Sequence, residues 1–416
     1  MSPAVADNSA RTTHAGPAAS RSARLLNRTG VRLLFLVPGG LALLTGLNAA
    51  LVLLGLPHVP VGRNLAASHG MLMVFGFIGT VIALERSVAL GRLAGFAAPA
   101  LLGLGGLALV SPLPQQVGKG LLFCGCVALA GVYLPLWKRQ REVAVLIQIL
   151  GAVAGIAATM LWLRIPDTAP LIPLLAVFVV LTIAGERLEL ARIHIHSPVA
   201  EPLLTGLSTL LLASGVGALL WPRHGLVFFG AVLGAIVVWL AVYDVARHTI
   251  RSTGLPRYIA GCLLAGYGWL AVAAVISTTA GIQAEAITGS AYDALTHAVF
   301  LGFTMSMIMA HAPVILPAVL RHPLPYRPIL VLPATLLHAS LCLRIFVADV
   351  LDDGPTRQFA GVVNIAAVVL FAALAAGLAA SARQRAGRAA PAPGNTLPIL
   401  RPQTQGPAAR KDRRTR

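Results

Sequence analysis

Long apolar runs separated by short polar breaks occupy most of this chain. Between residues 33 and 381, mainly apolar stretches alternate with clusters of charge, proline and glycine. A helix needs about 20 apolar residues, each rising about 1.5 Å, to cross the hydrocarbon core of a bilayer. The pattern therefore predicts an all-α polytopic membrane helix bundle. Its twelve expected spans are 33–55, 65–90, 93–111, 118–137, 142–163, 170–190, 201–220, 225–246, 257–279, 291–317, 327–349 and 359–381.

The two ends of the chain differ from its middle. Residues 1–30 are rich in Ala, Ser and Arg, and residues 382–416 carry prolines and many Arg. We expect a basic cytoplasmic tail at 1–30, a twelve-helix transmembrane domain at 31–381 and a disordered basic cytoplasmic tail at 382–416. The short loops between spans favour antiparallel packing of sequence neighbours.

Composition agrees with this interpretation. Of the 416 residues, 57% are apolar and 11% are charged, whereas soluble domains carry roughly 25% charged residues. Such a composition excludes an ordinary soluble enzyme and makes the lipid bilayer the main partner.

The formal net charge of +18 follows from topology rather than from nucleic-acid binding. With the N-terminus inside, only a few basic residues fall on the outer side, namely Arg63, Lys119, Arg164, Arg223, Arg344 and Arg357. The others lie in inner loops or tails, as the positive-inside rule requires. We therefore expect no nucleic-acid partner, a bacterial-type inner (plasma) membrane location and both termini in the cytoplasm.

Two spans end in the same way. The second ends in Glu85-Arg86 and the sixth, four spans later, in Glu186-Arg187. One interpretation is a pseudo-threefold arrangement of four-helix repeats, in which spans 2, 6 and 10 are equivalent; the other is chance. We interpret both pairs as ion pairs at the inner boundary, with a proton relay as the alternative.

Two histidines lie at matched depth in different spans. His69 enters the second span and His297 the tenth, each one or two turns from the outer surface. Two imidazoles on separate helices can clamp a metal or a haem iron from both faces, and neutral imidazole is a good ligand for haem iron. Asp293, four residues before His297, could orient the other ring nitrogen. The alternative is that each histidine bonds a helix carbonyl and merely packs.

Two further histidines within the spans could serve a metal. His311 lies 14 residues beyond His297, which is about 21 Å along a helix, so it cannot share the outer site. It precedes Pro313, and helix-end packing is the simpler explanation. His338 could join a second metal site or a proton path, or it could be a polar packing residue. Ser/His/Asp and Cys/His sets, HExxH and a phosphate-binding loop are absent, so enzymatic activity is left open.

The segments around His69 and His297 resemble a known family. Residues 69–79 (HGMLMVFGFIG) and 297–309 (HAVFLGFTMSMIM) resemble the second-helix and tenth-helix motifs of NnrS-type membrane proteins. The twelve-helix layout is more distantly similar to the catalytic subunit of haem-copper oxidases and nitric oxide reductases. The resemblance implies a haem b held by His69 and His297, a role linked to nitric oxide and denitrification, and a redox partner.

The chain also departs from these families. The oxidases hold copper through histidines of helices 6 and 7, and the corresponding spans here contain no buried histidine. Position 299 is Val299 and position 67 is Ala67, where the oxidases and NnrS proteins respectively carry another histidine. Copper is therefore conceivable but unsupported. We expect a haem-b-binding protein of nitric oxide metabolism or electron transfer. The alternatives are a transporter of a small solute or metal ion and a structural or assembly partner without a cofactor.

Overall fold

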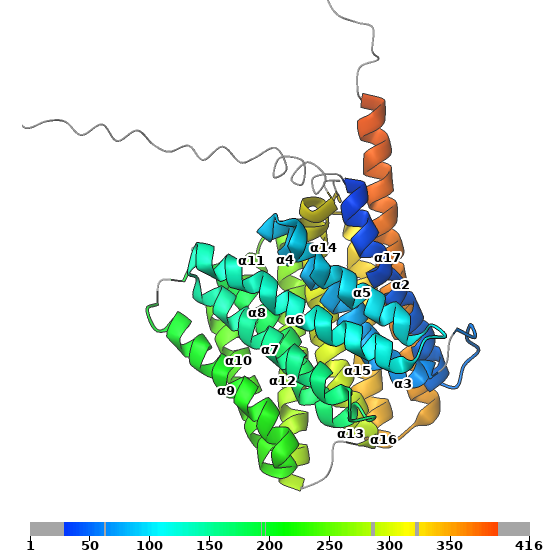
Figure 1. Ribbon diagram of the computed structural model, residues 1–416, viewed down its shortest axis with the longest axis vertical. Helices are drawn as coiled ribbons and strands as arrows, with labels where there is room; N and C mark the ends of the chain where they lie inside the picture. Colours follow the sequence, from blue (N-terminus) through cyan, green and yellow to red (C-terminus); the bar gives the residue numbers. More distant parts are fainter. Residues whose placement is uncertain are drawn as a thin grey trace, which may run out of the picture.

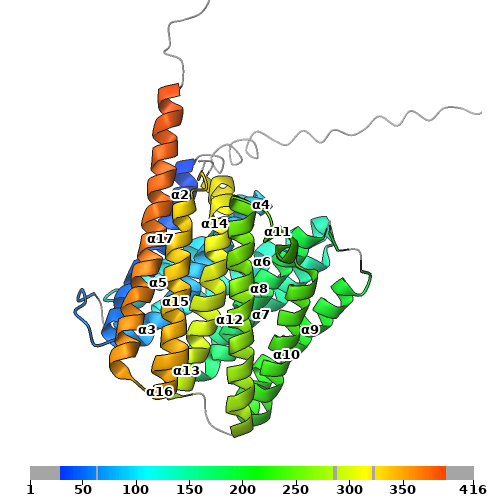
Figure 2. The same ribbon diagram turned by 180° about the vertical axis from the view of Figure 1, so that it is seen from behind.

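The described part of the chain is entirely helical, as expected. A computed structural model describes residues 29–61, 64–192, 194–195, 197–283, 288–320 and 324–389, and these contain no strand. The helices run side by side in one bundle (Figures 1 and 2). Most of the predicted tails, residues 1–28 and 390–416, lie outside the described residues.

The helical elements follow one another with short connections. They are α2 (Thr29–Leu53), α3 (Leu65–Met71), η1 (Leu72–Gly79), α4 (Thr80–Leu90), η2 (Leu93–Phe96), α5 (Ala97–Leu109), α6 (Gln115–Gln140), α7 (Val143–Trp162), η3 (Ala169–Leu171), α8 (Ile172–Ala191), α9 (Ala200–Leu220), α10 (Pro222–Tyr243), α11 (Ala246–Thr249), α12 (Leu255–Gln283), α13 (Gly289–His297), η4 (Ala298–Thr304), α14 (Met305–Leu320), η5 (Pro328–Leu330), α15 (Val331–Leu343), η6 (Arg344–Ala348), α16 (Asp349–Leu351) and α17 (Gly354–Ala389).

Eleven helices of the described residues are long and apolar enough to cross a membrane. They match eleven of the twelve predicted spans. The third, expected at 93–111, is a shorter apolar helix, Leu93–Leu109, made of η2 and α5. The protein is thus a polytopic helix bundle of the membrane type.

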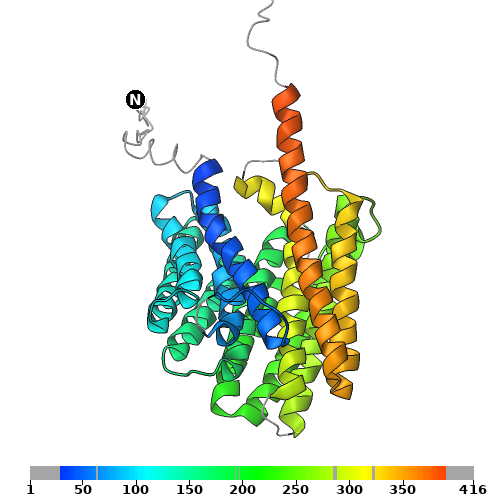
Figure 3. The same cartoon turned by 90° about the vertical axis from the view of Figure 1, so that its right-hand side faces the viewer.

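The last helix is longer than predicted. We expected the helix to end at residue 381 and disorder to follow, but α17 continues to Ala389. The added segment is rich in Ala and Arg, which favour helix strongly. Figure 3 shows α17 beside α2, projecting past the rest of the bundle.

The bundle has two distinct ends. The histidine end is where α3 and α13 begin; the terminal end is where α2 begins and α17 ends (Figures 1 and 2). Helix α8 forms the centre, because every residue from Ile172 to Gly185 is buried. Sequence neighbours such as α5 and α6, α7 and α8, and α9 and α10 pack against each other, as the short loops predicted.

Within the described residues, three helices contain π-helical segments. Two of them, η1 and η4, begin within one turn after His69 and His297 respectively. Thr80 stabilises the first by donating its hydroxyl to the Gly76 carbonyl at 2.7 Å, and Thr304 donates to the Val299 carbonyl at 3.0 Å. Such bulges occur frequently at functional sites. Helix α8, the proposed counterpart in a threefold repeat, contains no such segment, so the repeat remains a prediction.

Candidate functional site

A cavity of about 380 Å³ lies near the histidine end of the bundle. Pockets that bind small molecules and cofactors typically measure about 300–1,000 Å³. Helices α2, α3 with η1, α8, α13 with η4, η6 and α17 all contribute to its walls. Both His69 and His297 line it. Packing thus brings the two predicted histidines, which are 228 positions apart, to one site.

The His69 ring is fixed from the neighbouring helix. Its Nδ1 lies 2.8 Å from the carbonyl oxygen of Gly46 in α2. Since a carbonyl only accepts hydrogen bonds, Nδ1 carries the proton and donates it, and Nε2 keeps its lone pair. Nε2 of His69 makes no hydrogen bond within the described residues.

The His297 ring is held in the same tautomer. Its Nδ1 donates to the backbone carbonyl of Asp293, 2.8 Å away, and lies 3.3 Å from a carboxylate oxygen of the same residue. Asp293 therefore contacts Nδ1 of His297, and the sequence analysis expected it to orient the ring nitrogen that does not bind the iron. Across the part of the chain that the structure describes, Nε2 of His297 has no partner either.

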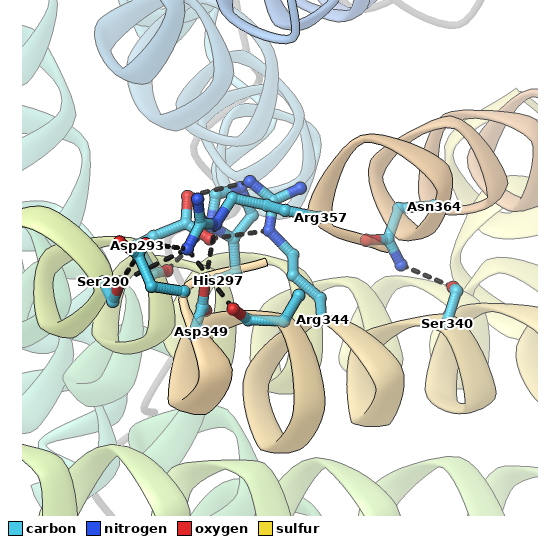
Figure 4. A network of polar contacts seen from close by, with 10 residues as sticks. Ser290, Asp293, His297, Ser340, Arg344, Asp349, Arg357 and Asn364 are labelled. Atoms are coloured by element: carbon cyan, nitrogen blue, oxygen red, sulfur yellow. Dashed lines mark hydrogen bonds and ion pairs between the residues drawn. The ribbon is translucent and has the colours of Figure 1, made fainter. Parts of the chain in front are cut away.

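Asp293 has a second and stronger partner. Arg344, at the start of η6, binds its carboxylate in a bidentate manner, with Nε and Nη2 at 2.7 and 2.8 Å. The Arg344 side chain is 10% exposed and that of Asp293 is 20% exposed. Figure 4 shows the guanidinium reaching over Asp293 beside His297. The histidine is thus tied to η6 through a largely buried ion pair.

A second arginine closes the same edge of the cavity. Arg357 of α17 donates to the carboxylates of Asp349 and Asp352, both at 2.9 Å, and to the Ser290 hydroxyl at 3.3 Å. These contacts join α13, α16 and α17 (Figure 4). The sequence analysis treated Arg344 and Arg357 only as outer basic residues. The signal that could have identified them was a pair of Arg among several Asp at one membrane boundary.

Two polar atoms beside the cavity have no hydrogen-bond partner among the residues that the structure describes. They are the Thr296 hydroxyl and the Asn364 side-chain oxygen, both buried, and both residues line the cavity. Asn364 uses its amide nitrogen to donate to the Ser340 hydroxyl at 2.6 Å (Figure 4). An unmade buried hydrogen bond costs about 1–3 kcal/mol, so a ligand with polar groups would be stabilised here.

The remaining walls are apolar. They are formed by Met73, Val74, Ile172, Leu175, Phe300, Leu301, Met305, Ile365 and Val368, among others. Gly70 also lines the cavity, and a Cβ added to it would meet nothing within 4 Å. The site therefore combines a broad apolar body with one polar edge.

His311 lies away from this cavity. Its Nδ1 donates to the Met307 carbonyl at 2.8 Å, and its Nε2 accepts from Arg187 at 3.0 Å. Both ring nitrogens are therefore engaged, which leaves none for the metal considered from the sequence. Arg187 in turn binds Asp244 in a bidentate manner, at 2.6 and 3.0 Å. The sequence analysis missed Asp244, which lies 57 positions from Arg187, at the end of α10.

His338 is also outside the cavity. Its Nδ1 accepts a hydrogen bond from the indole nitrogen of Trp269 at 3.0 Å, and the ring is half-buried. This contact favours the polar packing role among the alternatives that the sequence left open.

Ion pairs occur at the terminal end, as predicted: Arg86 pairs with its neighbour Glu85 within α4 and with two carboxylates of α8. Arg86 lies 3.2 Å from Glu85, 3.1 Å from Glu186 and 3.3 Å from Glu189. Glu186 therefore binds the arginine of the other pair and not its own neighbour Arg187.

The ligand set limits what the cavity can hold. No group of three or more His, Cys, Asp or Glu side chains suited to a metal ion occurs in the described ranges. Two imidazoles with free Nε2 atoms suit a cofactor that brings its other metal ligands with it, as a macrocycle does.

Comparison with known proteins identifies a family whose description states no function. No curated protein and no solved structure matches the chain. A family model described as a domain of unknown function (DUF8744) matches residues 32–380. Because this match covers nearly all of the helical bundle, including the cavity, the chain belongs to the DUF8744 family.

Proposed function

We propose that this protein binds a haem b in the cavity, with His69 and His297 as axial ligands, and serves electron transfer or nitric oxide handling. The observation that carries the proposal is that both imidazoles line one cavity, each with Nδ1 anchored and Nε2 free. The link to nitric oxide rests on the sequence resemblance alone. A bound haem would supply one-electron chemistry.

The residues present fit such a group. The apolar walls suit the body of a macrocycle, and Gly70 leaves room beside His69. Arg344 and Arg357 line the polar edge and can bind carboxylate substituents, since guanidinium groups recognise carboxylates in bidentate geometry. The unpartnered Thr296 hydroxyl can donate there as well.

The chain's own residues would prepare both ligands. The Gly46 and Asp293 carbonyls accept the Nδ1 protons and so hold each imidazole in the tautomer with a basic Nε2. Partners of this kind raise ligand basicity and fix ring orientation. The ion pair between Asp293 and Arg344 then restrains the His297 segment against η6.

The test is the absorption spectrum of the purified protein, recorded reduced minus oxidised together with iron analysis. Wild type should show a low-spin haem with two axial imidazoles and poor binding of carbon monoxide. His69→Ala and His297→Ala should each lose the haem or open it to carbon monoxide. His338→Ala, a histidine in a span but outside the cavity, is the matched control and should keep the wild-type spectrum.

Two outcomes would contradict the haem proposal. One is a wild-type protein without haem after expression in haem-sufficient cells. The other is a spectrum that survives both alanine substitutions at normal expression. Tight carbon monoxide binding by wild type would instead show that one of the two histidines is not a ligand.

The alternative function is transport of a small solute. The specific observation in its favour is a cavity with unpartnered polar atoms between helices that π-helical segments interrupt; transporters bind substrates at such discontinuities. Thr296→Val and Asn364→Leu would then reduce solute uptake into proteoliposomes while leaving any haem spectrum unchanged. Unaltered uptake of every solute tested in both variants would remove this alternative.

A further inference from the structure

The terminal end of the bundle contains an unbalanced charge cluster. Arg86 of α4 contacts three carboxylates, those of Glu85, Glu186 and Glu189, at 3.1–3.3 Å. Glu186 and Glu189 belong to α8, the central helix. One guanidinium cannot neutralise three ionised carboxylates, so the cluster would hold excess negative charge.

Three neighbouring basic residues within the described part of the chain make no ion pair with this cluster. Arg187, next to Glu186, is neutralised by its bidentate pair with Asp244. His311 of α14 accepts from Arg187 and donates to a carbonyl, so it is neutral in this geometry. Arg139 of α6 is exposed and donates to the Ala89 carbonyl, without an ion pair to the cluster.

Two of the carboxyls are close neighbours. Glu85 and Glu186 each place an oxygen against the same atom, Nη2 of Arg86, at 3.2 and 3.1 Å. Their side chains are only 24% and 16% exposed. Two carboxyls in a poorly hydrated site cannot both ionise easily, and such pairs share a proton.

Unpaired polar atoms continue from this cluster into the bundle. Tyr133 of α6 and Gln148 of α7 are both fully buried. Within the described residues, neither the Tyr133 hydroxyl nor either amide atom of Gln148 has a hydrogen-bond partner. Tyr133 belongs to α6, which packs against α4, the helix of Arg86. Gln148 packs beside Gly185, where an added Cβ would lie 2.7 Å from its Cγ.

Such atoms point to an internal polar ligand. Each unmade buried hydrogen bond costs about 1–3 kcal/mol, and water is the usual molecule that satisfies such groups in a protein interior. Protons and water can reach these buried groups through the cluster, because the Glu189 side chain is 34% exposed. A partly accessible carboxyl group is thus followed by carboxyls and polar atoms that are progressively more buried.

We propose that Glu85 and Glu186 form a proton-binding site that holds one proton between them, with Tyr133 and Gln148 binding water behind it. A hydronium ion from the aqueous phase at the terminal end transfers its proton to a carboxylate oxygen and becomes water; no electron moves. None of these residues lines the histidine cavity, so this site is independent of haem binding.

Infrared spectroscopy of the full-length protein in detergent tests the proposal. At neutral pH, wild type should show the carbonyl stretch of a protonated carboxyl, shifted in heavy water and fading as the pH rises. Glu85→Gln and Glu186→Gln should each lose this band, because a single remaining carboxyl ionises beside Arg86. Glu201→Gln is the control: this residue is 39% exposed and 4.0 Å from Arg192, and its substitution should leave the band intact.

The proposal is overturned if wild type lacks the band at neutral pH, or if the band persists in both glutamine variants. Tyr133→Phe gives a second measurement should the glutamine variants not fold, because it removes only the hydroxyl. It should shift the position of the band, since the water near the carboxyls loses one partner. An unshifted band in this variant would also overturn the proposal.

Discussion

At the residue scale, Asp293 organises the cavity because it contacts both His297 and Arg344. Its backbone carbonyl accepts from His297, while its carboxylate binds Arg344. Asp293 thus orients His297, the proposed axial ligand, and links the His297 segment to η6 through Arg344. Arg357 and Asp349 repeat the ion-pair part of this arrangement on the adjoining side.

Arg344→Gln should destabilise the protein, because it leaves the Asp293 carboxylate without its main partner. Loss of one member of a buried ion pair costs about 3–5 kcal/mol, and this pair is largely buried. Thermal unfolding in detergent should show a lower Tm. The double variant with Asp293→Asn should recover part of the loss, and a single variant as stable as wild type would contradict the pair's importance.

If haem binds as proposed, Asp293→Asn should weaken haem retention less than His297→Ala does. The carboxylate acts through the His297 ring, and changes to groups of that kind typically cost 10–100-fold in metal affinity. Haem loss to an acceptor protein, followed by absorbance, measures this. Equal loss in both variants would mean that Asp293 contributes more than orientation.

At the scale of elements, close packing depends on glycines at a few helix crossings. Helix α5 meets η1 where Gly106 faces Gly76, and a Cβ on Gly106 would lie 2.9 Å from the Gly76 Cα. The obstacle is backbone, which cannot rotate away as a side chain can. This crossing places η1, and hence the segment after His69, against the bundle.

Gly106→Val should therefore strain the α5–η1 contact. Overpacking of this kind costs about 1–3 kcal/mol, which a lower Tm would reveal. Gly131→Val is the matched control, because a Cβ at Gly131 of α6 meets nothing within 4 Å. Equal Tm values for the two variants would show that the crossing can relax.

At the scale of the whole molecule, charge distribution predicts how the bundle sits in the membrane. The terminal end carries most of the basic loops, so we predict that it faces the cytoplasm. The proposed haem site would then lie near the periplasmic surface and the proposed proton site near the cytoplasmic one.

Reporter fusions test this orientation. Fusions in the 138–141 and 247–257 segments should report cytoplasm, and those within 280–290 and 352–356 should report periplasm. Alkaline phosphatase and a fluorescent protein, active on opposite sides, provide the two readouts. Opposite signals at two of these positions would refute the predicted topology.

The sequence by itself determined the fold class, most span positions and the two cavity histidines. Lipid offers no hydrogen bonds, so long apolar runs must be helices, and each run is visible without reference to the others. The bounds were less exact: the third span is shorter than predicted, and α17 extends beyond its predicted end.

Tertiary structure alone decided which polar groups meet. Arg344 pairs with Asp293, 51 positions away in the sequence. Arg187 pairs with Asp244, 57 positions away, and Arg86 with Glu186, 100 positions away. These partners lie on different helices, and the periodicity of one helix says nothing about which face of another it will meet. The cavity edge and the carboxyl cluster therefore emerge only when the helices are packed together.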